Sequence, residues 1–279
     1  MLHVNQPLVT VDWLHKNLDQ ENLIIFDATI PKVTSKEVTN EQKECISNAI
    51  FFDLKGVFLD KEGEFPNTFP KTAYFEEQAQ QIGVNQNSCI IIYDQLGVYS
   101  SARVWWLFKT FGFNNVAVLN GGLPEWKENN FPVENNYKKR LTKGDFKAKL
   151  QPEKVTFIDQ VLSKINDESF CVADARSKGR FYAEIPEPRA TVKGGHIPNS
   201  YSLPYTELQE SGKMKTKEAL QEVFKTINPT NKSYIYSCGT GITACILALG
   251  LELTGHNNYA VYDGSWTEWG SLPDLPIEK

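Results

Sequence analysis

One cysteine stands in a loop whose composition favours chemistry at its sulfur. After Cys238 the chain continues with Gly239, Thr240, Gly241, Ile242 and Thr243. The two glycines allow a tight turn that points N–H groups toward the centre of the loop, and a helix after the loop adds the positive end of its dipole. Such surroundings favour a thiolate over a thiol. We therefore predict a nucleophilic Cys238 stabilised by the backbone amides of residues 239–243.

Two other interpretations of Cys238 are open. Most free cysteines of intracellular proteins are simply buried, although a core cysteine has no need of glycines one and three residues after it. Phosphatases also place a cysteine in a tight loop, but they require an arginine at the sixth position after it to clamp the phosphate. That position is Ala244, which argues against phosphatase chemistry.

The loop is predicted to join a strand to a helix. Residues 234–236 are aromatic and β-branched, which is typical of a buried strand, and residues 243–253 have the length and apolar composition of a helix. The same analysis predicts strands over 23–26 and 90–93, and helices beginning at Thr10 and spanning 72–82 and 100–111. Alternating strands and helices predict an α/β fold with an open, mostly parallel sheet.

The second half of the chain repeats the first. Tyr236 lies 143 residues after Tyr93, and the same offset aligns 112–118 with 255–261 and 120–126 with 263–269. Similarity held without a gap predicts two copies of one domain. We expect a first copy over 1–136, a polar linker over 137–153 and a second copy over 154–279.

The repeat assigns the chemistry to the second copy. At the offset of 143 residues, Cys238 aligns with Gln95, and the two loop glycines align with Leu96 and Val98. The first copy therefore lacks both the nucleophile and the glycines. We expect it to be non-catalytic.

Composition excludes several classes of protein. The formal charge of −5 gives no electrostatic reason to bind nucleic acid or an anionic membrane. The five cysteines are odd in number and widely spaced, so they suggest neither a disulfide framework nor a metal site. The N-terminus lacks the basic and apolar regions of a leader, and no segment is apolar enough to span a membrane. These features predict a soluble, cytoplasmic protein without a metal or organic cofactor.

Several motifs together resemble the rhodanese family of sulfurtransferases, in the two-domain form shared by thiosulfate and 3-mercaptopyruvate sulfurtransferases. The motifs are Arg103-Val104-Trp105-Trp106, Asn120-Gly121-Gly122, Asp174-Ala175-Arg176, Gly195-His196-Ile197-Pro198 and the Cys238 loop. The resemblance implies an α/β protein of two tandem rhodanese-like domains, each an open, mostly parallel sheet flanked by helices. It also implies that the cysteine carries sulfur as a persulfide from a small anionic donor to a thiol, thioredoxin or cyanide.

The resemblance assigns the donor's negative charge to Arg180 and Arg189. A small anion in a partly dry cleft requires fixed, planar, permanently charged donors, which arginine supplies and lysine does not. The alternative is that one of them pairs with Glu184 or Glu187. Two further polar residues are predicted to be structural: Arg176 as an ion pair with Asp174, and His196 as a hydrogen-bonding group.

The loop residues distinguish two donor classes. Relatives of the thiosulfate type carry basic residues directly after the cysteine, whereas this chain has the neutral Gly239 and Thr240, similar to the 3-mercaptopyruvate type. We therefore expect 3-mercaptopyruvate as donor, with thiosulfate as the alternative.

Other aspects of the mechanism stay open. The aspartate and histidine of the relay proposed for animal relatives align with Lys55 and Asn67, so proton transfer is assigned to Thr240 or water. A persulfide carrier loaded by a partner protein and a catalytically silent binding module are the other candidate functions.

Overall fold

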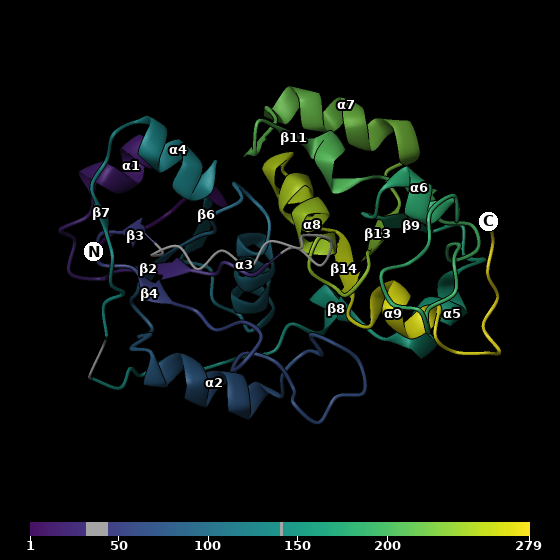
Figure 1. Cartoon of the computed structure of the whole chain (residues 1–279), viewed down its shortest axis with the longest axis horizontal. Helices are drawn as coiled ribbons and strands as arrows, with labels where there is room; N and C mark the ends of the chain where they lie inside the picture. Colours follow the sequence, from purple (N-terminus) through teal and green to yellow (C-terminus); the bar gives the residue numbers. More distant parts are fainter. Residues whose placement is uncertain (32–43, 140–141) are drawn as a thin grey trace. The chain divides into compact units, whose positions relative to one another are not determined.

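The computed structural model describes residues 1–31, 44–139 and 142–279, which form two compact units (Figure 1). Unit 1 contains Met1–Leu59, Pro70–Leu150 and Ser211–Met214, and unit 2 contains Asp60–Phe69, Gln151–Glu210 and Lys215–Lys279. Each unit thus includes a short segment from the other half of the sequence. None of the helices in the described part of the chain has the length and apolar composition needed to cross a bilayer.

Unit 1 is built on a five-stranded parallel sheet. Its strand order is β1 (Leu8–Val9), β6 (Val116–Leu119), β5 (Cys89–Tyr93), β2 (Leu23–Asp27) and β4 (Ile50–Phe51). The helices of the unit are α1 (Val11–Lys16), α2 (Thr72–Gln81), α3 (Ser101–Thr110) and α4 (Gly122–Glu128). The short strands β3 (Cys45–Ile46) and β7 (Val133–Glu134) pair antiparallel beside it.

Helices cover both faces of the unit 1 sheet, which explains why its central strands are apolar except for the final Asp27 of β2. Every residue of β2 is buried. Leu23 and Ile25 pack in one cluster with residues of α1 and α4, whereas Phe26 stacks toward Phe52 and Phe108 on the other face. Figure 1 shows α1 and α4 on one side of this sheet and α2 on the other.

Unit 2 repeats this architecture. Its parallel sheet has the order β10 (Tyr201–Ser202), β9 (Phe170–Asp174), β13 (Ser233–Ser237), β14 (Tyr259–Tyr262) and β8 (Val155–Thr156). The helices are α5 (Ile158–Lys164), α6 (Lys178–Phe181), α7 (Lys217–Ile227), α8 (Ala244–Leu253) and α9 (Ser265–Trp269). Short 3₁₀ turns are η1 (Pro152–Lys154) and η2 (Tyr205–Leu208); strand β11 is Gln209–Glu210, and strand β12 (Lys213–Met214) falls in unit 1.

The two sheets have the same strand order when β13 is superposed on β5 and β9 on β2. This confirms the predicted repeat and the parallel α/β class. The expected strands at 23–26 and 90–93 and the helices at 72–82 and 100–111 are also confirmed within a residue at each end. Thr10 caps α1 as expected, because its hydroxyl accepts the Trp13 amide at 3.2 Å.

The described part of the segment between the two copies packs on unit 1. Phe146 is buried, and its amide donates to the Val84 carbonyl at 3.1 Å. The Lys149 amide donates to the Phe111 carbonyl at 2.9 Å. A polar, lysine-rich segment is thus held by backbone bonds and one buried ring.

Parallel pairing brings three loops of unit 2 to one edge of its sheet. Ser237 at the end of β13 pairs with Asp174 at the end of β9, and Tyr236 pairs with Val261 of β14. The loops after β9, β13 and β14 therefore leave the sheet side by side, which is where open α/β sheets carry their ligand sites.

Candidate active site

Cys238 follows β13 directly, and α8 begins six residues later at Ala244. The buried strand ends before the glycines, and α8 is apolar on all sides, with residues 244–251 buried. Both ends of the Cys238 loop, residues 238–243, are therefore fixed by the core. Cys238 itself is 1% exposed.

The loop's first two carbonyls are bonded by residues of α9. The Trp266 amide donates to the Cys238 carbonyl at 2.9 Å. The Thr267 amide and hydroxyl both donate to the Gly239 carbonyl, at 3.0 and 2.6 Å. These bonds fix the orientation of two successive peptide planes.

The carbonyls that follow are bonded as well. Thr240 O accepts from Asn67 Nδ2 at 3.3 Å, Gly241 O from Cys245 Sγ at 3.3 Å, and Ile242 O from the Cys245 amide at 3.2 Å. Because a trans peptide points its N–H opposite to its C=O, and no described peptide is cis, the amides of residues 239–243 face away from these partners. Within the described residues, the amides of Gly239, Thr240, Ile242 and Thr243 donate to no protein acceptor.

Ser265 holds the cysteine backbone and is a residue that sequence reasoning missed. Its hydroxyl accepts the Cys238 amide at 3.2 Å, donates to the Tyr262 carbonyl at 2.8 Å and lies 4.0 Å from Cys238 Sγ. Ser265 is fully buried with a left-handed φ of 52°, at the position where the first copy has Gly122 with a φ of 56°. A left-handed φ is unfavourable for serine but not for glycine. A serine aligned with such a glycine is therefore a sequence signal that its hydroxyl is required.

Arg180 lies beside the loop and is held by Glu187. Its Nε and Nη2 donate to Glu187 at 3.1 and 2.5 Å. A Cβ built on Gly239 would lie 3.1 Å from Arg180 Nη2, so the absence of a side chain at 239 permits this approach. Its side chain is 19% exposed, so the site reaches solvent here. The alternative pairing with Glu187 thus occurs at Arg180, and it leaves Nη1 without a partner among the described residues.

Glu187 is held in turn by Arg176. Arg176 donates to Glu187 at 2.8 Å and binds both oxygens of Asp174, with its side chain fully buried. Burial lowers the pKa of Arg176, but the carboxylates of Asp174 and Glu187 outweigh burial, so that pKa is raised. The structural ion pair predicted for Arg176 is confirmed.

Arg189 reaches the site through Thr267. Its Nη1 donates to Thr267 Oγ1 at 3.4 Å, and Thr267 bonds the Gly239 carbonyl. Thr240 is 7% exposed, and its hydroxyl has no hydrogen-bond partner among the described residues. The structure therefore places both predicted arginines beside the Cys238 loop, which itself contains Thr240.

His196 and Lys55 lie outside this arrangement. His196 Nδ1 contacts the Phe181 carbonyl at 3.1 Å, and the imidazole stacks on the Phe181 ring, so His196 has the structural role expected of it. Lys55 is an exposed residue of unit 1, whereas Asn67 contacts the Cys238 loop in unit 2.

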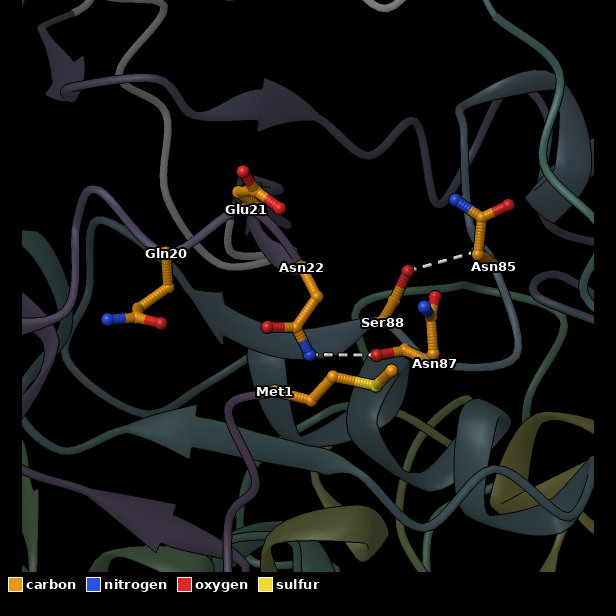
Figure 2. A pocket seen from close by; sticks show the side chains of 7 residues that line it. All are labelled: Met1, Gln20, Glu21, Asn22, Asn85, Asn87 and Ser88. Atoms are coloured by element: carbon orange, nitrogen blue, oxygen red, sulfur yellow. Dashed lines mark hydrogen bonds between the residues drawn. The ribbon is translucent and has the colours of Figure 1, made fainter.

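A polar pocket of about 400 Å³ lies in unit 1 at the amino ends of β2 and β5 (Figure 2). Its lining carboxamides bond within the protein: Asn22 Nδ2 donates to the Asn87 carbonyl at 2.8 Å. Ser88 accepts the Asn85 amide at 3.0 Å. No cysteine is among the described residues that line this pocket, so we assign it no part in the chemistry at Cys238.

A protein-family model described as "Rhodanese-like domain" matches residues 10–129 and 157–272. The chain belongs to the rhodanese family. The two matched ranges lie one in each half of this rhodanese, in agreement with its two similar sheets.

Full-length relatives of this rhodanese are named sulfurtransferases. It is 35% identical to the 3-mercaptopyruvate sulfurtransferase of Escherichia coli, over 97% of each chain. It is 37% identical to thiosulfate/3-mercaptopyruvate sulfurtransferase 1, mitochondrial, of Arabidopsis thaliana, over 99% of this chain and 79% of that protein. The crystal structure of SseA from Escherichia coli, described as a 3-mercaptopyruvate sulfotransferase, matches with a TM-score of 0.83 at 32% identity, covering 94% of this chain and 99% of that one.

Proposed function

We propose that this rhodanese is a 3-mercaptopyruvate sulfurtransferase that carries sulfur as a Cys238 persulfide. The observation that carries the proposal is the Cys238 loop: each carbonyl from Cys238 to Ile242 is bonded to protein, which turns the amides that follow them the other way. Amides held in this way stabilise negative charge without reorganising. The names of the full-length relatives support the same reaction.

In the first half-reaction the Cys238 thiolate attacks the sulfur of 3-mercaptopyruvate. The new S–S bond forms as the carbon–sulfur bond breaks, and the electron pair of the broken bond passes to the three-carbon fragment as the pyruvate enolate. The thiol proton stays on the outer sulfur, so the cysteine becomes Cys–S–SH. Protonation of the enolate carbon releases pyruvate.

The two arginines and Thr240 act on the donor. Nε and Nη2 of Arg180 donate to Glu187, and Nη1 is left for the donor. Arg189 donates to the Thr267 hydroxyl. We assign the carboxylate and carbonyl of the donor to these two cations. The Thr240 hydroxyl, or water, delivers the proton to the enolate.

In the second half-reaction the outer sulfur passes to a thiol, thioredoxin or cyanide. We assign both steps to the second copy, residues 154–279, with residues 1–136 as the non-catalytic copy and 137–153 as the linker. All five cysteines are free thiols, which supports the proposed cytoplasmic location.

Steady-state rates with two donors test the proposal. We expect kcat/KM for 3-mercaptopyruvate to exceed that for thiosulfate by at least about tenfold, because a neutral loop does not compensate a doubly charged inorganic anion; this ratio corresponds to ~1.4 kcal/mol. A higher value for thiosulfate would assign the alternative donor. Turnover of neither donor would indicate a persulfide carrier loaded by another protein.

A further inference from the structure

The segment Asp60–Phe69 belongs to the first half of the sequence but packs within unit 2. Its Phe69 amide donates to Asp263 Oδ2 at 2.7 Å, directly before the turn that bonds the Cys238 loop. Its Asn67 side chain donates from Nδ2 to the Thr240 carbonyl at 3.3 Å. One short segment is thus attached to both loops at the carboxyl edge of the unit 2 sheet.

Unit 1 contains an equivalent attachment. The segment Ser211–Met214 packs there, and the Met214 amide donates to Asn120 Oδ1 at 2.9 Å. Asn120 aligns with Asp263 at the offset of 143 residues, so this bond corresponds to the one from Phe69.

Gly212 in unit 1 occupies the place that Asn67 has in unit 2. A Cβ on Gly97, which aligns with Thr240, would lie only 2.4 Å from the Gly212 carbonyl oxygen, so the two glycines meet closely. Gly212 and Asn67 are both left-handed, with φ of 76° and 64°. Glycine and asparagine both tolerate that conformation, so the backbone does not explain the difference. In unit 2, the asparagine adds a carboxamide that bonds to the Cys238 loop.

The carboxamide completes a series of bonds. Trp266 and Thr267 fix the carbonyls of Cys238 and Gly239, and Asn67 fixes the next one, that of Thr240. Holding that carbonyl fixes the orientation of the peptide that follows Thr240. A carboxamide does not titrate between pH 5 and 9, so it positions the loop and relays no proton.

We propose that Asn67 is a positioning residue of this enzyme: it holds the Thr240 carbonyl and thereby keeps the Cys238 loop in the conformation that presents its amides to the sulfur. The inference rests on the proposed function, and it gives the Asp60–Phe69 segment a part in catalysis.

The test replaces Asn67 by glycine, the residue that unit 1 uses at this place. We expect Asn67→Gly to fold as the wild type and to lower kcat with 3-mercaptopyruvate about tenfold, with KM changed by less than about twofold, because a loop that is no longer held stabilises the transition state less while donor binding is kept. Asn231→Gly is the matched control, since Asn231 is an exposed residue of unit 2 with a φ of 54°, and its kcat should equal that of the wild type.

A second variant tests the direction of the hydrogen bond. Asn67→Asp has nearly the same shape, but its carboxylate repels the Thr240 carbonyl, whereas its protonated form donates. Aspartate is ionised at neutral pH, so we expect Asn67→Asp to lower kcat at pH 7 at least as much as Asn67→Gly does. A wild-type kcat for Asn67→Asp or for Asn67→Gly would overturn the positioning role.

A measurement without donor separates this inference from the proposed function. Iodoacetamide labelling of Cys238 at pH 7, followed by peptide mass spectrometry, should be about tenfold slower in Asn67→Gly than in the wild type or Asn231→Gly. If the wild type failed to turn over 3-mercaptopyruvate, the proposed function would fail, and the labelling rates would still decide whether Asn67 positions the loop. Equal labelling rates would reject the role of Asn67.

Discussion

The hydrogen-bond donors of the Arg180 guanidinium have two uses: two of its nitrogens bond to protein, and the third is left for a ligand. Glu187 accepts from its Nε and Nη2, Arg176 donates to Glu187 and is itself paired with Asp174, and the Arg180 guanidinium remains beside Gly239. The residue type was predictable because an anionic donor requires a planar cation. Its fixation was not, because Glu187 was only one of two nearby carboxylates, and the sequence contains no information on which cation each of them faces.

Arg180→Lys tests this division of the guanidinium. Lysine keeps the charge but cannot bond Glu187 in two places and still offer a donor to the ligand, so we expect the KM for 3-mercaptopyruvate to rise at least about tenfold while the KM for the acceptor is unchanged. The matched control is Lys178→Gln, which removes an exposed cation of the same helix that pairs with Glu207. An unchanged donor KM in Arg180→Lys together with a raised donor KM in Lys178→Gln would mean that only long-range charge matters.

The loop between a strand and a helix occurs in both copies, and the first copy shows what such a loop binds. Asp94 follows β5, and its carboxylate accepts the amides of Leu96, Tyr99 and Ser101 at 2.9, 2.8 and 2.9 Å. The Ser101 hydroxyl donates to the same carboxylate at 2.6 Å. The loop of the first copy is therefore a cradle for negative charge that is already occupied by a carboxylate of its own.

The second copy leaves the corresponding place open. Ser237 aligns with Asp94 and is too short to reach across the loop; its buried hydroxyl has no hydrogen-bond partner among the described residues. The amides of Gly239 and Ile242, which donate to no acceptor among the described residues, are thus available to another anion, in agreement with a thiolate or persulfide at Cys238. The repeat predicts the loss of Cys238 and the glycines from the first copy, but the significance of Asp94 appears only with its bonds.

Ser237→Asp should give the Cys238 loop a carboxylate of its own, as Asp94 does in the loop of the first copy. The new carboxylate would accept from the amides of Gly239 and Ile242, which align with Leu96 and Tyr99, and so compete with the sulfur. We expect kcat/KM to fall about a hundredfold, comparable to the loss of an oxyanion-hole donor, without loss of the fold. Ser237→Asn is the control of similar size without charge and should lose much less. Near wild-type activity of Ser237→Asp, measured as pyruvate release, would contradict the cradle.

For the whole molecule, the repeat and the period of its apolar residues were sufficient to predict two parallel α/β units, because buried strands and helices follow from local composition. The packing of Asp60–Phe69 in unit 2 and of Ser211–Met214 in unit 1 was not predictable. It depends on single hydrogen bonds between residues far apart in sequence, such as Phe69 with Asp263. The same is true of Thr267 and Asn67 at the Cys238 loop, whereas the alignment of Ser265 with Gly122 is a signal that the sequence does contain.

Across the whole molecule, the surroundings of Cys238 differ from those of the other four cysteines. Burial raises the pKa of Cys45 to about 11 and the pKa values of Cys89 and Cys171 to about 12, so these thiols stay protonated at neutral pH. Cys245 donates its thiol to the Gly241 carbonyl at 3.3 Å. Among the five cysteines, only Cys238 stands in a loop with amides that are available to an anion.

The central claim is tested most directly by locating the transferred sulfur. The protein is incubated with 3-mercaptopyruvate without an acceptor, digested under non-reducing conditions and analysed by peptide mass spectrometry. We predict the added mass of one sulfur atom on the peptide that contains Cys238 and on none of the other cysteine peptides, with its loss in Cys238→Ser. A labile sulfur of comparable yield in Cys238→Ser, or at another cysteine of the wild type, would contradict the account.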